Sequence, residues 1–541
     1  MGSGTQTVKD SNIVEMTGKA AALLFTLLAL PWLLPAESAG QAVSNAMLVY
    51  GQYGNYYPQY RLWTGSAWSD PTNALSAGNA DINYVVVKAC PVRDEYVAVT
   101  LNNNREVRAQ IWRDGEWGSE QVIATVANSA NRGVDVAYES LSGEAVVVSA
   151  DGDADPTCYV WDGDAWSGPG TVNLSRTGTA RWIKLAADPT SDELIMMAMD
   201  QNRYYTAQVW DGSNAWGNEL LCYGRAVNVG YESMDVKYET SGNQGVIVNN
   251  CGTANNGLFN WCAWNGSAWS SQVSNNVLGD YMRFGRLEND PNSDNMLLAY
   301  LDNDSDIGKV FWNGSAFGAY TELETSGRSA VERCVYGIFE NIAAHAGHAL
   351  VCYGDTTRGR SRHAANPSSA TWQAEVNAAT GNYVVQACRT GDGKILGMWF
   401  AGPANTYYFS WHNGSSWSAE QVIENSSSVR SSPYKEPFMI APQLCRRPVS
   451  LYNVGSTGRW DTVVAWATNS GGPGRRGIPA SDINVFFDAN SVSNCALTKP
   501  AAVNSINTIG YTNTLSIGTN TLGVAGNLVH GGGIITIGSS A

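Results

Sequence analysis

The chain has 541 residues, of which 44% are apolar, 15% are charged and 56 are glycines. Its 20 tryptophans and 25 tyrosines exclude a disordered chain, and the low charge excludes a helical bundle or coiled coil. A net charge of −15 argues against a nucleic-acid partner. The composition therefore predicts an all-β protein with glycine-rich turns.

The N-terminal residues 1–40 have the pattern of a secretory signal peptide. Lys19 precedes an apolar run from Ala20 to Leu34, and small residues follow it up to Gly40. The run has 15 residues, fewer than the roughly 20 that a membrane-spanning helix needs. We expect the segment to be removed, with Met16 as an alternative start. The mature chain is then secreted or held at the cell surface, without a transmembrane segment. A short buried helix or a retained anchor is the alternative.

Residues 41–470 contain a tryptophan repeat. A Trp-x-Gly-x-x-Trp pattern, with small variations, begins at Trp63, Trp112, Trp161, Trp210, Trp264, Trp312 and Trp411. The first four tryptophans are 49 residues apart, and a gap of 99 residues before Trp411 leaves room for a degenerate unit around Trp372. The spacing therefore indicates eight units.

Each unit contains four short segments of alternating polarity. Around Trp210 these cover residues 182–186, 193–199 and 204–210, and a fourth starts at Trp216. Turns rich in Asp, Gly, Pro and Asn separate them, which is typical of antiparallel strands. Four strands per 40–50 residues, repeated, predict the blades of a β-propeller.

The ring closure can be predicted as well. The first unit lacks an innermost strand, and the spare strand Pro437–Ala441 can supply it. We therefore predict an all-β propeller of eight four-stranded blades. A further strand pair at residues 448–452 and 462–466 leaves open a seven-bladed ring with accessory strands. The paired tryptophans flank tight turns and are interpreted as scaffold, with sugar stacking as the alternative.

The turn Trp161-Asp-Gly163-Asp-Ala-Trp166 resembles that of secreted bacterial β-propellers with Trp-Asp-Gly-x-x-Trp repeats. Its place in the blade is similar to that of the Asp-box turn of sialidase-type propellers, and its Gly-x-x-Trp resembles the blades of fungal-type fucose lectins. It departs from an Asp box because Asp162 and Gly163 are adjacent and no Ser precedes them. No sialidase nucleophile or arginine triad can be assigned, so the resemblance implies a lectin-like binding module.

Residues 482–541 carry a different repeat, which follows a glycine-rich linker at residues 471–481. Short alternating segments are separated by Gly or Asn, and tryptophan is absent. This texture resembles the opening rungs of parallel β-helices in bacterial adhesins and autotransporter passengers, and it predicts a β-solenoid fragment. Because no capping segment follows, we expect a truncated gene model; strand addition to a partner is the alternative.

One mouth of the propeller channel is the predicted ligand site. Counting back eight residues from Pro91, Pro189 and Pro291 gives Asn83, Arg181 and Arg283. The blade period adds Arg132, Glu232 and Asn382. Arginines bind carboxylates with two parallel hydrogen bonds, so we expect an acidic sugar as ligand. Stacking walls are expected from tyrosines in the adjoining loops, namely Tyr204, Tyr205, Tyr231, Tyr281 and Tyr407. The alternative is a structural ring in which Glu232 pairs with Arg181 or Arg283.

Metal sites and catalytic motifs give weaker signals. The alternating carboxylates Asp302, Asp304 and Asp306 predict a calcium site, with an ordinary hairpin loop as the alternative. A second loop, at residues 151–155, has the same pattern. No other cofactor is expected. His345 and His348 have no evident carboxylate partner, which argues against zinc. No hydrolase, phosphate-loop or metalloprotease motif is present, so no catalytic residue is assigned.

Export permits disulfides among the ten cysteines. Cys251–Cys262 is the first candidate pair and Cys334–Cys352 the second, with buried free thiols as the alternative. Taken together, the sequence predicts an exported cell-surface or matrix protein for binding or adhesion, with a glycan or a surface protein as partner. The alternatives are a polysaccharide-acting hydrolase or lyase, and a structural repeat protein without a ligand.

Overall fold

The computed structural model describes residues 45–242, 244–251, 256–276, 280–328, 333–401, 406–425, 435–445, 448, 450–455 and 457–537. The predicted signal peptide lies outside the described residues. Within these ranges, two short 3-10 turns, η1 (Ala343–His345) and η2 (Val463–Ala465), are the helical elements. The described part contains no helix with the length and apolar character needed to cross a membrane.

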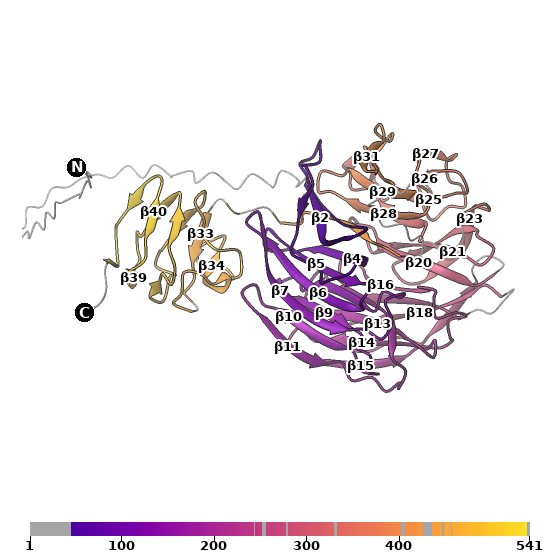
Figure 1. Cartoon of the computed structure of the whole chain (residues 1–541), viewed down its shortest axis with the longest axis horizontal. Coiled ribbons are helices and arrows are strands. Elements are labelled where there is room, and N and C mark those ends of the chain that lie inside the picture. Colours follow the sequence, from indigo (N-terminus) through magenta and orange to yellow (C-terminus); the bar gives the residue numbers. More distant parts are fainter. Residues whose placement is uncertain are drawn as a thin grey trace, which may run out of the picture. The chain divides into compact units, whose positions relative to one another are not determined.

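Eight four-stranded antiparallel sheets follow one another around a ring as the blades of a propeller (Figure 1). Blade 1 consists, from the axis outward, of β32 (Phe438–Pro442), β1 (Ala46–Gln52), β2 (Asn55–Trp63) and β3 (Thr72–Asn73). Blade 2 contains β4 (Ile82–Ala89), β5 (Glu95–Asn102), β6 (Glu106–Arg113) and β7 (Glu116–Thr125). Blade 3 contains β8 (Val134–Tyr138), β9 (Ala145–Ser149), β10 (Thr157–Trp161) and β11 (Trp166–Thr171). Blade 4 contains β12 (Ala180–Ala187), β13 (Leu194–Asp200), β14 (Tyr205–Trp210) and β15 (Trp216–Leu221).

The second half of the ring repeats the same order. Blade 5 contains β16 (Met234–Tyr238), β17 (Gly245–Asn250), β18 (Leu258–Trp264) and β19 (Val273–Asn276). Blade 6 contains β20 (Met282–Asn289), β21 (Asn295–Asp302), β22 (Ile307–Asn313) and β23 (Phe317–Glu324). Blade 7 contains β24 (Val335–Phe339), β25 (Ala349–Gly354), β26 (Gly359–Ala364) and β27 (Val376–Ala379). Blade 8 contains β28 (Val384–Arg389), β29 (Ile395–Ala401), β30 (Thr406–His412) and β31 (Gln421–Glu424).

The ring closes by strand exchange, as predicted. β32, from the end of the propeller sequence, pairs antiparallel with β1 at its beginning, so that Met47 lies opposite Ala441. The innermost strands contact each other in the order β32, β4, β8, β12, β16, β20, β24, β28 and back to β32. The prediction of eight blades is confirmed, and the apolar faces of neighbouring blades form the core.

The tryptophan repeat is part of this core. The first tryptophan of each turn is the last or the last but one residue of the third strand, and Trp63, Trp161 and Trp312 are no more than 1% exposed. It lies beside the second tryptophan across the turn, as in Trp161 and Trp166, whose ring centroids are 5.5 Å apart. The scaffold interpretation is confirmed. In blade 8, however, His412 and not Trp411 bridges to Trp417, so a histidine occupies the position of the first tryptophan.

Beyond the propeller, the strands pair in parallel, except for the antiparallel pair β33 and β34. One sheet contains β34 (Trp466–Ala467), β33 (Ser450–Asn453), β35 (Asn484–Phe486), β38 (Ser505–Asn507) and β41 (Leu528–Val529). The other two contain β36 (Cys495–Ala496), β39 (Thr514–Gly518) and β42 (Ile534–Ile537), and β37 (Ala501–Val503) and β40 (Leu522–Val524). β33 and β34 thus belong to this region and not to a blade. Paired residues of β35, β38 and β41 lie 21–22 positions apart in the sequence. Assignment to a β-solenoid stays a prediction.

The disulfide predictions are wrong. None of the ten cysteines forms a disulfide, and eight of them are buried, as the alternative of buried thiols predicted. Cys262 lies opposite Ile247 in the ladder of blade 5, whereas Cys251 follows the far end of the partner strand. Cys352 lies opposite Tyr336, and Cys334 precedes that strand pair. In neither case do the two thiols reach each other.

Candidate functional site

The predicted channel mouth is closed by buried ion pairs. Arg132 Nη2 and Arg333 Nε each lie 2.7 Å from an oxygen of Glu232. Glu436 completes the group from blade 1, 3.9 Å from Arg333. These four residues precede the innermost strands of alternate blades, and their side chains are at most 5% exposed. We call them the axial plug.

The plug also receives cations from the blades between. Lys184 of blade 4 lies 2.8 Å from Glu232, and Arg286 of blade 6 lies 2.8 Å from Glu436. Arg333 lies against the rings of Tyr84, Trp182 and Phe284, with its guanidinium carbon 4.8–5.9 Å from their centroids. Buried charges are tolerated only when they are paired in this way. The structure is therefore closest to the alternative prediction of a structural polar ring. Glu232, however, pairs with Arg132 and Arg333 and not with Arg181 or Arg283.

Arg181 and Arg283 do not join Arg132, which corrects the predicted arginine cluster. In blades 2, 4 and 6 the register of the innermost pair shifts between residues 82 and 84, 180 and 182, and 282 and 284. Such a bulge inserts one extra residue and turns side chains away from their repeat position. The next residues, Tyr84, Trp182 and Phe284, take the place beside the axis instead.

The displaced residues are spread around the rim. Arg181 contacts Gln201 at 3.3 Å, and the buried Asn83 donates to the Ser129 carbonyl and accepts from Lys435. Arg283 lies over the rings of Tyr231 and Tyr281.

The other members of the predicted site do not line the channel mouth together either. Asn382 donates to the Asp355 carbonyl, Tyr204 lies between Arg176 and Arg225, and Tyr205 and Tyr407 are buried in the blades rather than forming walls.

The axis opens on the other side of the plug into a cavity of about 640 Å³. Its floor is formed by Arg132, Asp135, Lys184 and Arg286, and its mouth by the turns that follow the innermost strands. The mouth residues include Pro91, Ser140, Pro189, Pro291, Asn341 and Gly391. The sequence placed the ligand site at the beginning of these strands, whereas the open cavity lies toward their ends. We call this space the axial cavity.

Positive charge predominates in the axial cavity. Six cationic side chains line it, namely Lys88, Arg132, Lys184, Lys237, Arg286 and Arg389, against the carboxylates of Asp135, Asp235 and Glu288. Burial raises the pKa of Asp235 to about 8, which favours its neutral form at pH 7. Burial also lowers the pKa of Lys88. Within the described residues, neither Lys88 nor Arg389 forms an ion pair with a carboxylate, so both can receive an anionic group.

The predicted calcium loop is a hairpin turn. The Asp302 carboxylate accepts the amides of Asp304 at 3.0 Å and Asp306 at 2.9 Å, which folds the loop between β21 and β22. Asp200 has the same role in blade 4, where it accepts the amide of Tyr204. This geometry matches the hairpin alternative, and calcium at Asp302, Asp304 and Asp306 stays a prediction.

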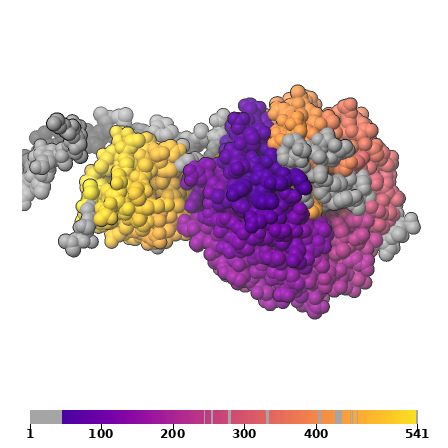
Figure 2. All heavy atoms as spheres, viewed as in Figure 1, coloured from indigo at the N-terminus to yellow at the C-terminus, as the bar shows by residue number. Residues whose placement is uncertain are grey.

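Exposed aromatic side chains are found on the β1–β2 hairpin. Tyr53, Tyr56 and Tyr57 are 59%, 41% and 47% exposed. The N-terminal strands of blade 1, coloured indigo, lie at the surface in Figure 2. No sequence motif marks these three tyrosines.

Comparisons with known proteins agree with the fold. No family model matches the chain, and no curated protein matches it. Among solved structures, the BP39L lectin from Burkholderia pseudomallei aligns with 12% identity and a TM-score of 0.46, over 63% of this chain and 100% of that one. The six-bladed fucose-recognising lectin of Aleuria aurantia aligns with 10% identity and a TM-score of 0.36, over 64% and 97%. Dihydro-heme d1 dehydrogenase NirN aligns with 10% identity and a TM-score of 0.48, over 72% and 76%. The β-propeller is shown by the strand topology, and two of these three solved structures are lectins.

Proposed function

We propose that this protein is a lectin-like binding protein and that the axial cavity holds the anionic group of an acidic glycan. The carrying observation is the reversal of charge. A chain of net charge −15 lines one cavity with six cations. Four of them are paired, since Arg132, Lys184 and Arg286 contact glutamates of the axial plug and Lys237 contacts Glu288. Lys88 and Arg389 form no ion pair within the described residues, and their surplus positive charge suits an anionic ligand.

The size and polarity of the cavity fit this proposal. Its volume of about 640 Å³ falls within the range of roughly 300–1,000 Å³ that small-ligand sites occupy. Ser140, Asn289 and Asn341 near the mouth offer uncharged polar groups for sugar hydroxyls. Lys88 and Arg389 belong to blades 2 and 8, which flank blade 1, and they are the residues expected to contact the carboxylate or sulfate.

The test is calorimetric titration of the full chain with three probes: a galacturonate oligosaccharide, a sulfated oligosaccharide and a neutral oligosaccharide of equal length. The account predicts binding of an acidic probe, weaker binding at high salt and no binding of the neutral one. The variant Lys88→Met/Arg389→Met is expected to lose at least tenfold in affinity, because two cations are removed from the cavity. The matched control is Lys394→Met, whose lysine pairs with Asp392 outside the cavity.

Two outcomes decide against the proposal. Equal binding of the acidic and neutral probes, or unchanged affinity in the double variant, removes the cavity as the site. Chromatography of each probe after incubation separates binding from chemistry, because shortened products support the polysaccharide hydrolase or lyase alternative.

The proposed setting is the cell surface or extracellular matrix, where a glycan-binding protein acts in adhesion. It rests on the apolar run from Ala20 to Leu34 and on the low charge of the chain. Deleting this run is expected to leave the protein in the cytoplasm of its host. Export of the deletion variant at the wild-type level contradicts the proposed localisation.

A further inference from the structure

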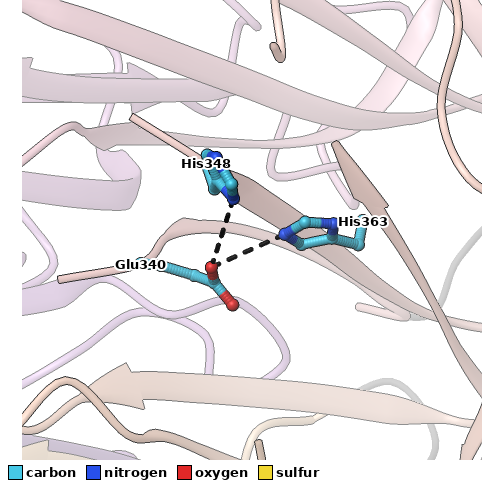
Figure 3. Close-up of side chains that lie close together, drawn as sticks. All are labelled: Glu340, His348 and His363. Carbon is cyan, nitrogen blue, oxygen red and sulfur yellow. Dashed lines mark ion pairs between the residues drawn. The ribbon is translucent and has the colours of Figure 1, made fainter. Parts of the chain in front are cut away.

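Four of the five histidines surround a single buried carboxylate. Glu340 follows the innermost strand of blade 7 and is 0% exposed. His345 belongs to η1, His348 precedes β25, His363 lies in β26, and His412 ends β30 of the next blade. Figure 3 shows Glu340, His348 and His363 directed toward one another. His345 and His348 have no evident carboxylate partner in the sequence, and the fold supplies Glu340.

The distances bring these groups within the reach of one ion. Glu340 Oε2 lies 3.5 Å from His363 Nε2 and 3.8 Å from His348 Nδ1. One ligand atom from each of these three residues can be chosen so that all lie within 4.8 Å of one another. An ion with bonds of about 2.0–2.2 Å holds its ligand atoms roughly 3–4 Å apart, so small side-chain rotations suffice.

Three polar atoms of these residues are left without hydrogen bonds. Within the described residues, Glu340 Oε1, His348 Nδ1 and His363 Nε2 are buried and have no hydrogen-bond partner, whereas Glu340 Oε2 lies within hydrogen-bond distance of His345. Buried polar atoms in proteins are nearly always satisfied, and a bound ion is one recognised reason when they are not. Three such atoms in one place therefore point to a binding site.

The remaining histidines lie against the carboxylate. His345 Nδ1 is within hydrogen-bond distance of Glu340 Oε2, at 2.9 Å. His412 Nδ1 lies 3.2 Å from Oε1, and the same nitrogen accepts the backbone amide of Gly414. Both imidazoles therefore restrict how the Glu340 carboxylate can turn.

We propose that Glu340, His348 and His363 form a binding site for a divalent transition-metal ion, with zinc as the preferred occupant. Two imidazoles and one carboxylate are a known zinc ligand set, and the fourth position stays open to water or a ligand. His345 and His412 are positioning residues that orient Glu340. The site is independent of the acidic-glycan proposal, because no residue of the set lines the axial cavity.

The test uses the full chain after removal of metals with a chelator. Titration with zinc chloride alone is expected to give one bound ion per chain and a rise in melting temperature, because the ion binds the native state. Calcium and magnesium are expected to give the same shift, if any, in the wild type and in His348→Ala/His363→Ala, since nitrogen ligands disfavour both ions. Zinc X-ray absorption is expected to show nitrogen and oxygen neighbours. The variant His348→Ala/His363→Ala is expected to lose binding, and His412→Asn to lose about 10–100-fold in affinity.

Controls separate this site from other zinc ligands. His530→Ala removes the fifth histidine, which contacts Thr508 outside the propeller, and is expected to bind zinc like the wild type. Cys251→Ser/Cys445→Ser removes the two cysteines that are not fully buried and is expected to do the same. Circular dichroism must show that the histidine variants fold. The proposal is overturned by unchanged zinc binding in the folded double variant, by sulfur neighbours at about 2.3 Å, or by no binding at millimolar zinc.

Discussion

Blades 3 and 5 differ from blade 7 at one equivalent position. Glu139, Glu239 and Glu340 each follow the innermost strand of their blade and are buried. Glu139 accepts the indole N–H of Trp210 at 2.7 Å, and Glu239 accepts that of Trp312 at 2.9 Å. At Glu340 the corresponding tryptophan is replaced by His412.

The difference separates scaffold from function. One indole donor satisfies one oxygen of Glu139 or Glu239, and burial raises the pKa of both carboxyls to about 7. Glu340 is instead surrounded by four imidazoles, three more than a structural pair needs. A repeat provides its own control, because the same backbone position without histidines shows what packing alone requires.

The largest expected effect tests whether the axial plug, which is built from the odd-numbered blades, stabilises the fold. Glu232→Gln leaves Arg132, Arg333 and Lys184 with an uncompensated buried charge. Breaking such a buried pair costs about 3–5 kcal/mol of unfolding free energy, measured by urea denaturation. The control Glu120→Gln, which loses a partly exposed pair with Arg108, is expected to cost no more than about 1 kcal/mol. Similar costs for the two variants contradict a structural plug.

A smaller effect is expected at Glu239, whose carboxylate accepts one hydrogen bond within the described residues, from the indole N–H of Trp312. Trp312→Phe removes the donor from Glu239 and leaves a buried carboxyl oxygen without a partner, at a cost of about 1–3 kcal/mol. Trp112 in blade 2 is the matched control, because its indole nitrogen has no hydrogen bond within the described residues. If Trp112→Phe destabilises the protein as much as Trp312→Phe, the indole–carboxylate pair contributes nothing beyond packing.

The pH dependence of stability gives a third test. Burial raises the pKa of Glu239 from 4.5 to about 7, so the folded chain holds a proton that the unfolded chain releases. This contribution to stability is complete below about pH 4.5 and is lost as the pH rises through about 7. Glu239→Gln is therefore expected to flatten the fall in melting temperature between pH 4.5 and 7.5. A variant with the wild-type slope shows that Glu239 is already ionised in the folded chain.

The smallest effect is expected at Arg181, which the sequence placed in the ligand site. Its side chain contacts Gln201 at the rim and does not reach the plug or the axial cavity. Arg181→Ala is expected to change the unfolding free energy by no more than about 1 kcal/mol and to leave acidic-glycan binding unchanged. A several-fold loss of affinity, measured by calorimetry, restores the rim as the binding surface.

The blades could be predicted from the sequence because their signals are local. A 49-residue period, alternating polarity and Asp-Gly or Asn-Gly turns each lie within one unit, and the exchanged strand β32 is recognisable as a remainder. The site could not be predicted equally well. Bulges at residues 83, 181 and 283 leave no mark in the composition, yet each reverses which side chain faces the axis.

Long-range pairing explains the other omissions. No proline stands eight residues after Arg333 or Glu436 to mark their positions in the sequence. They lie 101 and 204 residues from Glu232 in the sequence, and the three residues come together only when the ring closes. The histidine cluster joins β24, η1, β26 and β30, so His345 and His348 look isolated in the sequence. The tryptophan motif was aligned on Trp411, which concealed that His412 occupies the repeat position.

The central claim is that Glu340 belongs to a metal site while Glu139 and Glu239 belong to the scaffold. The most direct test is a crystal structure of the zinc-loaded chain with anomalous differences collected on both sides of the zinc absorption edge. The account predicts one strong peak within about 2.3 Å of ligand atoms of Glu340, His348 and His363, and none beside Glu139 or Glu239. A map without a peak among these three side chains, at full zinc loading, contradicts it.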